Sequence, residues 1–136
     1  MPPETVTPLE QALLDRIAGA QVSIDAAFYD FDRPAIRDAL IAAHQRGVIV
    51  RSVTDLETVT GADAEYVAAL VDAGISVVND GSAGRSSADP ALRELGASLA
   101  APIMHDKYLV FDDAAVWTGS TNLSVNDLTH NHNNAL

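Results

Sequence analysis

The chain has 136 residues, no cysteine, a net charge of −11 and a sequence pI near 4.4. This length corresponds to one domain with a core of its own, and the absence of cysteine excludes a disulfide framework and a thiolate metal site. The acidity disfavours tight, non-specific binding of nucleic acid, because phosphate contacts need basic groups, but it permits a phosphodiester substrate in a small basic pocket.

Helix and strand patterns alternate over the first part of the chain. Apolar residues recur at helical spacing in three segments, and each segment ends at or near a glycine. The expected helices cover residues 8–20, with Leu9, Leu13 and Ile17 on one face, residues 34–46, with Ile36, Leu40 and Ala43 on one face, and residues 63–73. Strand patterns lie between and after them, in residues 22–28, 48–55 and 75–80.

The rhythm breaks after residue 80. Residues 80–102 are rich in Gly, Ser and Ala and favour a loop, with one short helix possible from Pro90. Residues 107–112 and 115–120 then flank a short Asp-Ala turn, which predicts an antiparallel hairpin. Residues 122–131 favour a short helix, and the chain stops where an apolar run begins, which looks like an incomplete strand.

The alternation predicts an α/β fold, with a mixed, mostly parallel sheet flanked by helices and a C-terminal hairpin. The N-terminal segment lacks the basic and apolar regions of a signal peptide, and no stretch is apolar enough to span a bilayer. We therefore expect a cytoplasmic protein with no transmembrane segment.

The only lysine of the chain, Lys107, stands in a pattern that combines it with His105 and Asp112 as H-x-K-x4-D. Period two in the strand places His105 and Lys107 on one face, where an ammonium supplies fixed charge for a phosphate and an imidazole can attack phosphorus or move a proton. Ser120 and Asn122, near the end of the partner strand of the hairpin, can add a hydroxyl and an amide to the same pocket.

H-x-K-x4-D followed by G-S-x-N resembles the signature of the phospholipase D superfamily, the HKD phosphodiesterases. Residues 22–55 resemble the first strand, helix and second strand of that family, and residues 70–80 resemble the stretch before its HKD strand. The resemblance implies a single phospholipase D-like domain over residues 1–136, built as an α-β-α sandwich with the HKD strand in the C-terminal hairpin. It also implies that the C-terminal strand and helix of the family fold are missing.

The family mechanism joins two HKD motifs across a pseudo-twofold axis, and no metal or other cofactor takes part. One histidine forms a phosphohistidine and the other protonates the leaving oxygen. Carried over, His105 acts as nucleophile or general acid and base, while Lys107, Ser120 and Asn122 bind phosphate. Asp112 is counted with the catalytic group, although a largely structural role stays open for it.

Two departures from the family pattern bear on function. The chain has one HKD motif, so the resemblance implies a homodimer or a second HKD domain. The family has an acidic residue after G-S-x-N that orients the imidazole, and here Asn133 stands at the matching place. Asparagine can accept a hydrogen bond from the imidazole but does not stabilise imidazolium by charge.

Three hypotheses follow. The first is a small homodimeric nuclease similar to the bacterial single-motif nucleases, and the second is half of a phospholipase or phosphatidyltransferase. The third, of another class, is a catalytically idle HKD scaffold that binds phosphate groups or protein partners. Chain length favours the nuclease, the acidity weakly favours a lipid substrate, and the complete His, Lys, Ser and Asn set argues against the idle scaffold.

Overall fold

The computed structural model describes residues 6–29, 31–55, 64–79, 106–120 and 123. Five strands form one mixed sheet in the order β3-β2-β1-β4-β5. The strands are β1 (Ser23–Phe28), β2 (Ile49–Thr54), β3 (Ser76–Asn79), β4 (Tyr108–Phe111) and β5 (Ala115–Thr118). β1 pairs in parallel with β2, and β2 with β3, whereas β4 is antiparallel to both β1 and β5. Four of these strands therefore run in one direction, which confirms the predicted mixed, mostly parallel sheet.

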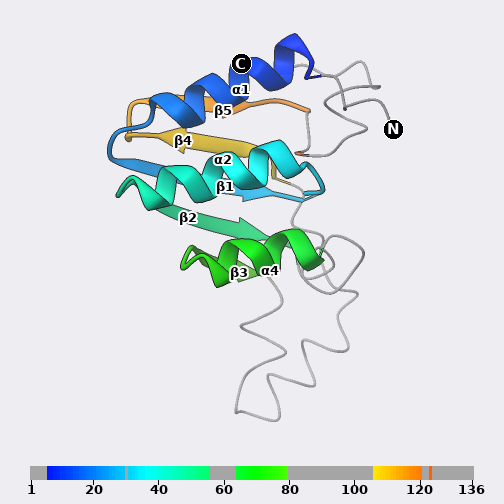
Figure 1. Cartoon of the computed structure of the whole chain (residues 1–136). Coiled ribbons are helices and arrows are strands. Elements are labelled where there is room, and N and C mark those ends of the chain that lie inside the picture. Colours follow the sequence, from blue (N-terminus) through cyan, green and yellow to red (C-terminus); the bar gives the residue numbers. More distant parts are fainter. Residues whose placement is uncertain (1–5, 30, 56–63, 80–105, 121–122, 124–136) are drawn as a thin grey trace, which may run out of the picture.

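Three helices lie on one face of this sheet (Figure 1). They are α1 (Pro8–Gly19), α2 (Pro34–Gln45) and α4 (Ala64–Asp72). α2 packs against β2 and against both other helices, and α4 packs against β3. The residues that the structure describes thus form one helical layer on one sheet, and the core lies between the two.

The helix boundaries follow from local sequence signals. The hydroxyl of Thr7 accepts a hydrogen bond from the backbone N–H of Glu10 at 3.3 Å and so caps the start of α1. Pro34 begins α2, where a missing N–H costs nothing. Gly47 and Gly74 follow α2 and α4 with φ near +95°, a conformation that ends a helix and that side chains disfavour. The predicted glycine stops are confirmed at these two positions.

The buried face of α1 differs from the expected one. Glu10, Leu13 and Ile17 are buried, whereas Leu9 is only partly buried. The expected face of α2, with Ile36, Leu40 and Ala43, is confirmed. The helical spacing of residues 10, 13 and 17 is as regular as that of residues 9, 13 and 17, but a carboxylate enters the core only where a partner compensates its charge.

The sequence of β1 alternates apolar Ile24, Ala26 and Phe28 with Ser23, Asp25 and Ala27, which predicts one buried and one exposed face, but β1 is buried on both faces. Val22 lies outside the strand and is exposed. Ala27 is buried although it lies on the face away from the helices, because its neighbours in register are Val53 and Tyr108, whose larger side chains flank it. A central strand of a sheet that is covered on both sides needs no polar face.

The hairpin of β4 and β5 turns at Asp112 and Asp113, one residue earlier than the expected Asp-Ala turn. Both residues have φ near +54°, and the N–H of Ala114 donates to the carbonyl of Phe111 at 3.0 Å. Aspartate tolerates this left-handed conformation better than most residues, so a chain reversal fits here. The loop expected over residues 80–102 and the helix expected over residues 122–131 lie outside the described residues.

Candidate active site

Lys107 and Ser120 lie at the same end of the sheet. β4 is antiparallel to β1, with Tyr108 opposite Ala27, so Lys107 at the start of β4 lies where β1 ends. Ser120 follows β5, whose last residue, Thr118, is opposite Tyr108. The hairpin therefore places the lysine of H-x-K and the serine of G-S-x-N at the same end of the sheet.

Lys107 is half-buried, and its ammonium faces an aromatic ring. The Nζ atom lies 6.0 Å from the centroid of Tyr29, the residue that directly follows β1. The hydroxyl of Thr118 donates to the carbonyl of Lys107 at 3.5 Å, which joins the two strands of the hairpin at this end. The lysine is thus held between the ends of β1 and β5.

The segment that contains Ser120 is attached to the loop between β1 and α2. Leu123 forms a parallel β-bridge with Phe31, and the N–H of Asp32 donates to the carbonyl of Leu123 at 3.1 Å. Leu123 is 2% exposed and belongs to the core. Because Leu123 follows Ser120 by three residues, the loop between β1 and α2 holds the chain shortly after Ser120.

This loop is anchored by a buried ion pair. The guanidinium of Arg33, at the start of α2, makes two hydrogen bonds to the carboxylate of Glu10 in α1, of 2.5 and 2.7 Å. The two side chains are 2% and 0% exposed. The bidentate geometry compensates both charges and satisfies their hydrogen bonds, which makes burial of the pair tolerable. Phe31 packs on Phe28 at 4.8 Å between ring centroids and fixes the same loop from the core side.

Asp112 lies at the opposite end of β4. Its carboxylate accepts hydrogen bonds from the backbone N–H groups of Gln21, Val22 and Ser23, at 2.7 to 3.1 Å. These groups stand at the entry to β1. These hydrogen bonds hold the pKa of Asp112 below its usual value because they stabilise the ionised form, and the bond from Val22 has the largest effect. The structure does not bring Asp112 together with Lys107. The hydrogen bonds of Asp112 instead hold the start of β1 against the end of β4.

Three of the residues predicted for the site, His105, Asn122 and Asn133, lie outside the described residues. Within the described ranges, no three His, Cys, Asp or Glu side chains are grouped so that they could hold a metal ion. No helix in that part of the chain is long and apolar enough to cross a membrane. Metal-free catalysis by His105 thus stays a prediction.

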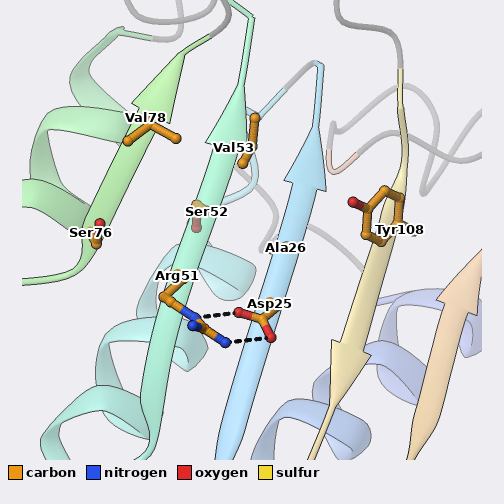
Figure 2. A pocket seen from close by; sticks show the side chains of 8 residues that line it. All are labelled: Asp25, Ala26, Arg51, Ser52, Val53, Ser76, Val78 and Tyr108. Atoms are coloured by element: carbon orange, nitrogen blue, oxygen red, sulfur yellow. Dashed lines mark hydrogen bonds and ion pairs between the residues drawn. The ribbon is translucent and has the colours of Figure 1, made fainter. Parts of the chain in front are cut away.

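A hollow of about 310 Å³ lies on the sheet face away from the helices (Figure 2). Val53, Val78 and Tyr108 line it, and Arg51 pairs with Asp25 at one side of it, at 2.6 and 2.9 Å. Because the carboxylate of Asp25 compensates the guanidinium, the hollow offers an anion less attraction than an unpaired cation would. Its mostly apolar lining does not favour phosphate, and Lys107 does not line it.

Tyr29, Glu10 and Arg33 were not predicted from the sequence. A signal existed for Glu10, whose spacing to Leu13 and Ile17 is helical, but a charged residue on an apolar face is usually read as solvent-exposed. Tyr29 gave no signal, because its contact with Lys107 joins residues that are far apart in the sequence.

Comparison with known proteins identifies the class. Residues 13–136 match the family model described as "Cardiolipin synthase, PLD-like domain". Among solved structures, Nuc of Salmonella typhimurium, described as a phospholipase D family member, is 32% identical and superposes with a TM-score of 0.70 over 95% of this chain and 76% of its own. NucT of Helicobacter pylori shares the fold, with a TM-score of 0.72 at 24% identity, over 95% of this chain and 79% of its own.

The chain therefore belongs to the PLD-like domain family of the phospholipase D superfamily, as the H-x-K-x4-D and G-S-x-N patterns indicated. Curated relatives include the mitochondrial cardiolipin hydrolases of Xenopus laevis, 32% identical over 124 residues, and of Homo sapiens, 30% identical over 124 residues. Each match covers 91% of this chain but only 50% and 42% of those proteins. The chain thus spans about half the length of the curated relatives it matches, or less.

Proposed function

We propose that this domain is a metal-independent phosphodiesterase that acts through a phosphohistidine intermediate on a lipid phosphodiester of the cardiolipin class. The observation that carries the proposal is the convergence of Lys107 and Ser120 at one end of the sheet, on the two strands that also lead to His105 and Asn122. The ammonium of a lysine and the hydroxyl of a serine at one end of the sheet can both donate hydrogen bonds to the oxygens of a phosphate.

In the proposed reaction, an imidazole nitrogen of His105 attacks phosphorus, and the bond between phosphorus and the leaving oxygen breaks. The His105 of a second copy gives its proton to that oxygen. The same imidazole then takes a proton from water, whose oxygen attacks phosphorus and releases the first His105. Lys107, Ser120 and Asn122 bind the phosphoryl oxygens throughout and stabilise the negative charge that gathers on them.

The proposal requires two copies of the site, because one imidazole cannot attack phosphorus and protonate the leaving group from opposite sides. With one His105 in each chain, a homodimer about a twofold axis is the simplest arrangement that supplies both. The active site would then lie on the dimer axis.

The lipid substrate is supported by two observations. The curated relatives bear the name cardiolipin hydrolase, at 28 to 32% identity. The net charge of −11 disfavours a long polyanion, whose binding depends on many basic contacts, but a single phosphodiester needs only one local cation. A nuclease is the second candidate, because Nuc of Salmonella typhimurium carries a related chain of the same fold, and the sequence itself resembles the bacterial single-motif nucleases.

One set of assays tests the activity. The purified protein is incubated in EDTA with cardiolipin vesicles, with phosphatidylcholine vesicles, with single- and double-stranded DNA and with a generic aryl phosphodiester. We expect cleavage of the aryl phosphodiester and of cardiolipin in EDTA, and no turnover by His105→Ala. Loss of all activity in EDTA with recovery on adding zinc or magnesium would contradict the metal-independent mechanism. Cleavage of DNA but of no lipid would show that the substrate is a nucleic acid.

The two-copy site is tested by mixing. Wild-type protein is allowed to exchange subunits with an increasing fraction of His105→Ala at constant total protein, and turnover is followed against the wild-type fraction. If both histidines of a dimer take part, only wild-type dimers are active, and an equal mixture retains about a quarter of the turnover, since the active species varies with the square of that fraction. Turnover in direct proportion to the wild-type fraction, or a monomer at micromolar concentration with full activity, would exclude the shared site.

A further inference from the structure

Tyr29 lies next to Lys107, the lysine of the proposed phosphate site. It directly follows β1, and Lys107 directly precedes β4, while the register Ala27–Tyr108 brings these two ends together. The ring centroid of Tyr29 lies 6.0 Å from the Nζ atom of Lys107, within the range of a cation–π contact. The contact therefore couples the end of the first strand to the lysine of the HKD motif.

The backbone that carries Tyr29 is fixed on both sides. Phe28 before it and Phe31 after it are 1% and 0% exposed, and their rings are in contact. Arg33, two residues further, is held by Glu10 in α1. The same loop binds Leu123 through Phe31 and Asp32. Tyr29 thus lies in a loop that contacts both Lys107 and the segment of Leu123.

A lysine in a phosphate site gains from such a neighbour. Its ammonium sits on a flexible stem with many rotamers, so it binds a phosphate more tightly when something restricts its direction. A carboxylate would restrict it but would also cancel its charge. The face of an aromatic ring attracts the ammonium through its quadrupole and leaves the charge available to a phosphate.

We propose that Tyr29 is a positioning residue of the phosphate site, whose ring holds the ammonium of Lys107 towards the bound phosphate. The proposal rests on the proposed function insofar as Lys107 binds phosphate. The proposal does not include a direct contact between Tyr29 and substrate, since Tyr29 acts through Lys107. Tyr29→Phe keeps the ring face and is expected to behave as wild type, whereas Tyr29→Leu removes the ring at similar volume.

Because Lys107 is the only lysine, its geometry can be measured directly. Protein labelled with ¹³C-lysine gives the side-chain signals of one residue in a ¹H–¹³C spectrum. Protons above a ring face are shifted upfield by the ring current, so we expect upfield Hε signals in the wild type and Tyr29→Phe, and ordinary values in Tyr29→Leu. Ordinary values in the wild type would overturn the proposal without any variant, even if Tyr29→Leu failed to fold.

A double-mutant cycle tests the role in phosphate binding. The dissociation constant of inorganic phosphate is measured by calorimetry for the wild type, Tyr29→Leu, Lys107→Met and the double variant. We expect Tyr29→Leu to weaken phosphate binding about threefold to fivefold when Lys107 is present, as a cation–π contact at a partly exposed site implies, and to change nothing in the Lys107→Met background. Equal weakening in both backgrounds, or none in either, would overturn the proposal.

Tyr108 provides the matched control. It directly follows Lys107 in the sequence but is 40% exposed and lies on the sheet face away from the helices (Figure 2). Tyr108→Leu is expected to change neither the Hε signals of Lys107 nor the phosphate affinity. Neither measurement needs turnover, so an absence of hydrolysis combined with the expected coupling would reject the proposed function and retain the role of Tyr29.

Discussion

The two ends of β4 carry residues of one sequence motif, and they differ in what those residues contact. At the start of the strand, the ammonium of Lys107 lies near the ring of Tyr29, at the end of the sheet where Ser120 follows β5. At the end of the strand, the carboxylate of Asp112 accepts hydrogen bonds from Gln21, Val22 and Ser23. The spacing of the motif therefore reflects the length of one strand, with chemistry proposed for one end and attachment of β1 at the other.

The two ends of β4 are also stabilised differently. The Asp112 end uses backbone N–H groups close to the surface, so its strength depends on the ionisation of one carboxylate. The Lys107 end rests on a loop anchored in the core by Glu10 and Arg33, whose charges are fully enclosed. Substitution of Lys107 should therefore lower activity, whereas substitution of Asp112 should lower stability.

The largest effect is expected for Lys107→Met, which removes the ammonium of the only lysine from the proposed site. We expect kcat/KM on an aryl phosphodiester to fall by about a hundredfold to a thousandfold, the usual cost of removing one donor that stabilises transition-state charge. The thermal midpoint should hardly change, because Lys107 is half-buried. Arg51→Met is the control of equal charge, since it removes a cation from the hollow on the sheet face away from the helices (Figure 2), which Lys107 does not line. Equal losses of activity in both variants would show that net charge, and not position, matters.

Glu10→Gln is expected to produce the largest loss of stability. It removes the carboxylate charge that pairs with the buried guanidinium of Arg33, and breaking a buried pair in this way costs about 3–5 kcal/mol. The free energy of unfolding from urea titrations measures this loss. Glu65→Gln, in the exposed first turn of α4, should change it by less than about 0.5 kcal/mol. A small effect of Glu10→Gln would mean that the loop does not depend on the ion pair.

Asp112→Asn is expected to lower the thermal midpoint and leave kcat largely unchanged in the protein that remains folded. Asparagine tolerates the positive φ of this turn position and can still accept from one side, but it lacks the charge that strengthens the hydrogen bonds from Val22 and Ser23. Asp113→Asn, with the same φ in the same turn, is the control and should leave the midpoint nearly unchanged. A loss of kcat as large as that of Lys107→Met would instead place Asp112 in the chemistry.

The pH dependence of stability gives the smallest and most specific effect. The pKa of Asp112 is lower in the folded protein than in the unfolded chain, so the folded state holds this proton less tightly. Its contribution to stability is complete above the unfolded pKa, about 3.9, and is lost as the pH falls through the lower folded value. The gap in thermal midpoint between wild type and Asp112→Asn should therefore narrow below about pH 4. A gap that stays constant from pH 6 to pH 3 would show that ionisation of Asp112 does not contribute.

Much of this protein could be derived from the order of its residues. The spacing of Ile36, Leu40 and Ala43 fixed the buried face of α2, and Gly47 marked its end, because helix periodicity and backbone conformation are local properties. The alternation of helices and strands gave the α/β class, and the lone lysine between a histidine and an aspartate gave the family.

Tertiary structure decided what depended on contacts between distant residues. The sequence placed Asp112 beside Lys107 in one motif, but a four-residue strand with side chains on fixed faces carries them to opposite ends, and Asp112 meets Gln21 only because β4 is antiparallel to β1. Glu10 enters the core because Arg33, in another helix, compensates its charge there. Tyr29 lies near Lys107 because β1 pairs with β4, which brings the end of β1 to the start of β4. Local patterns determine elements, whereas the partners of charged side chains depend on which ends the sheet brings together.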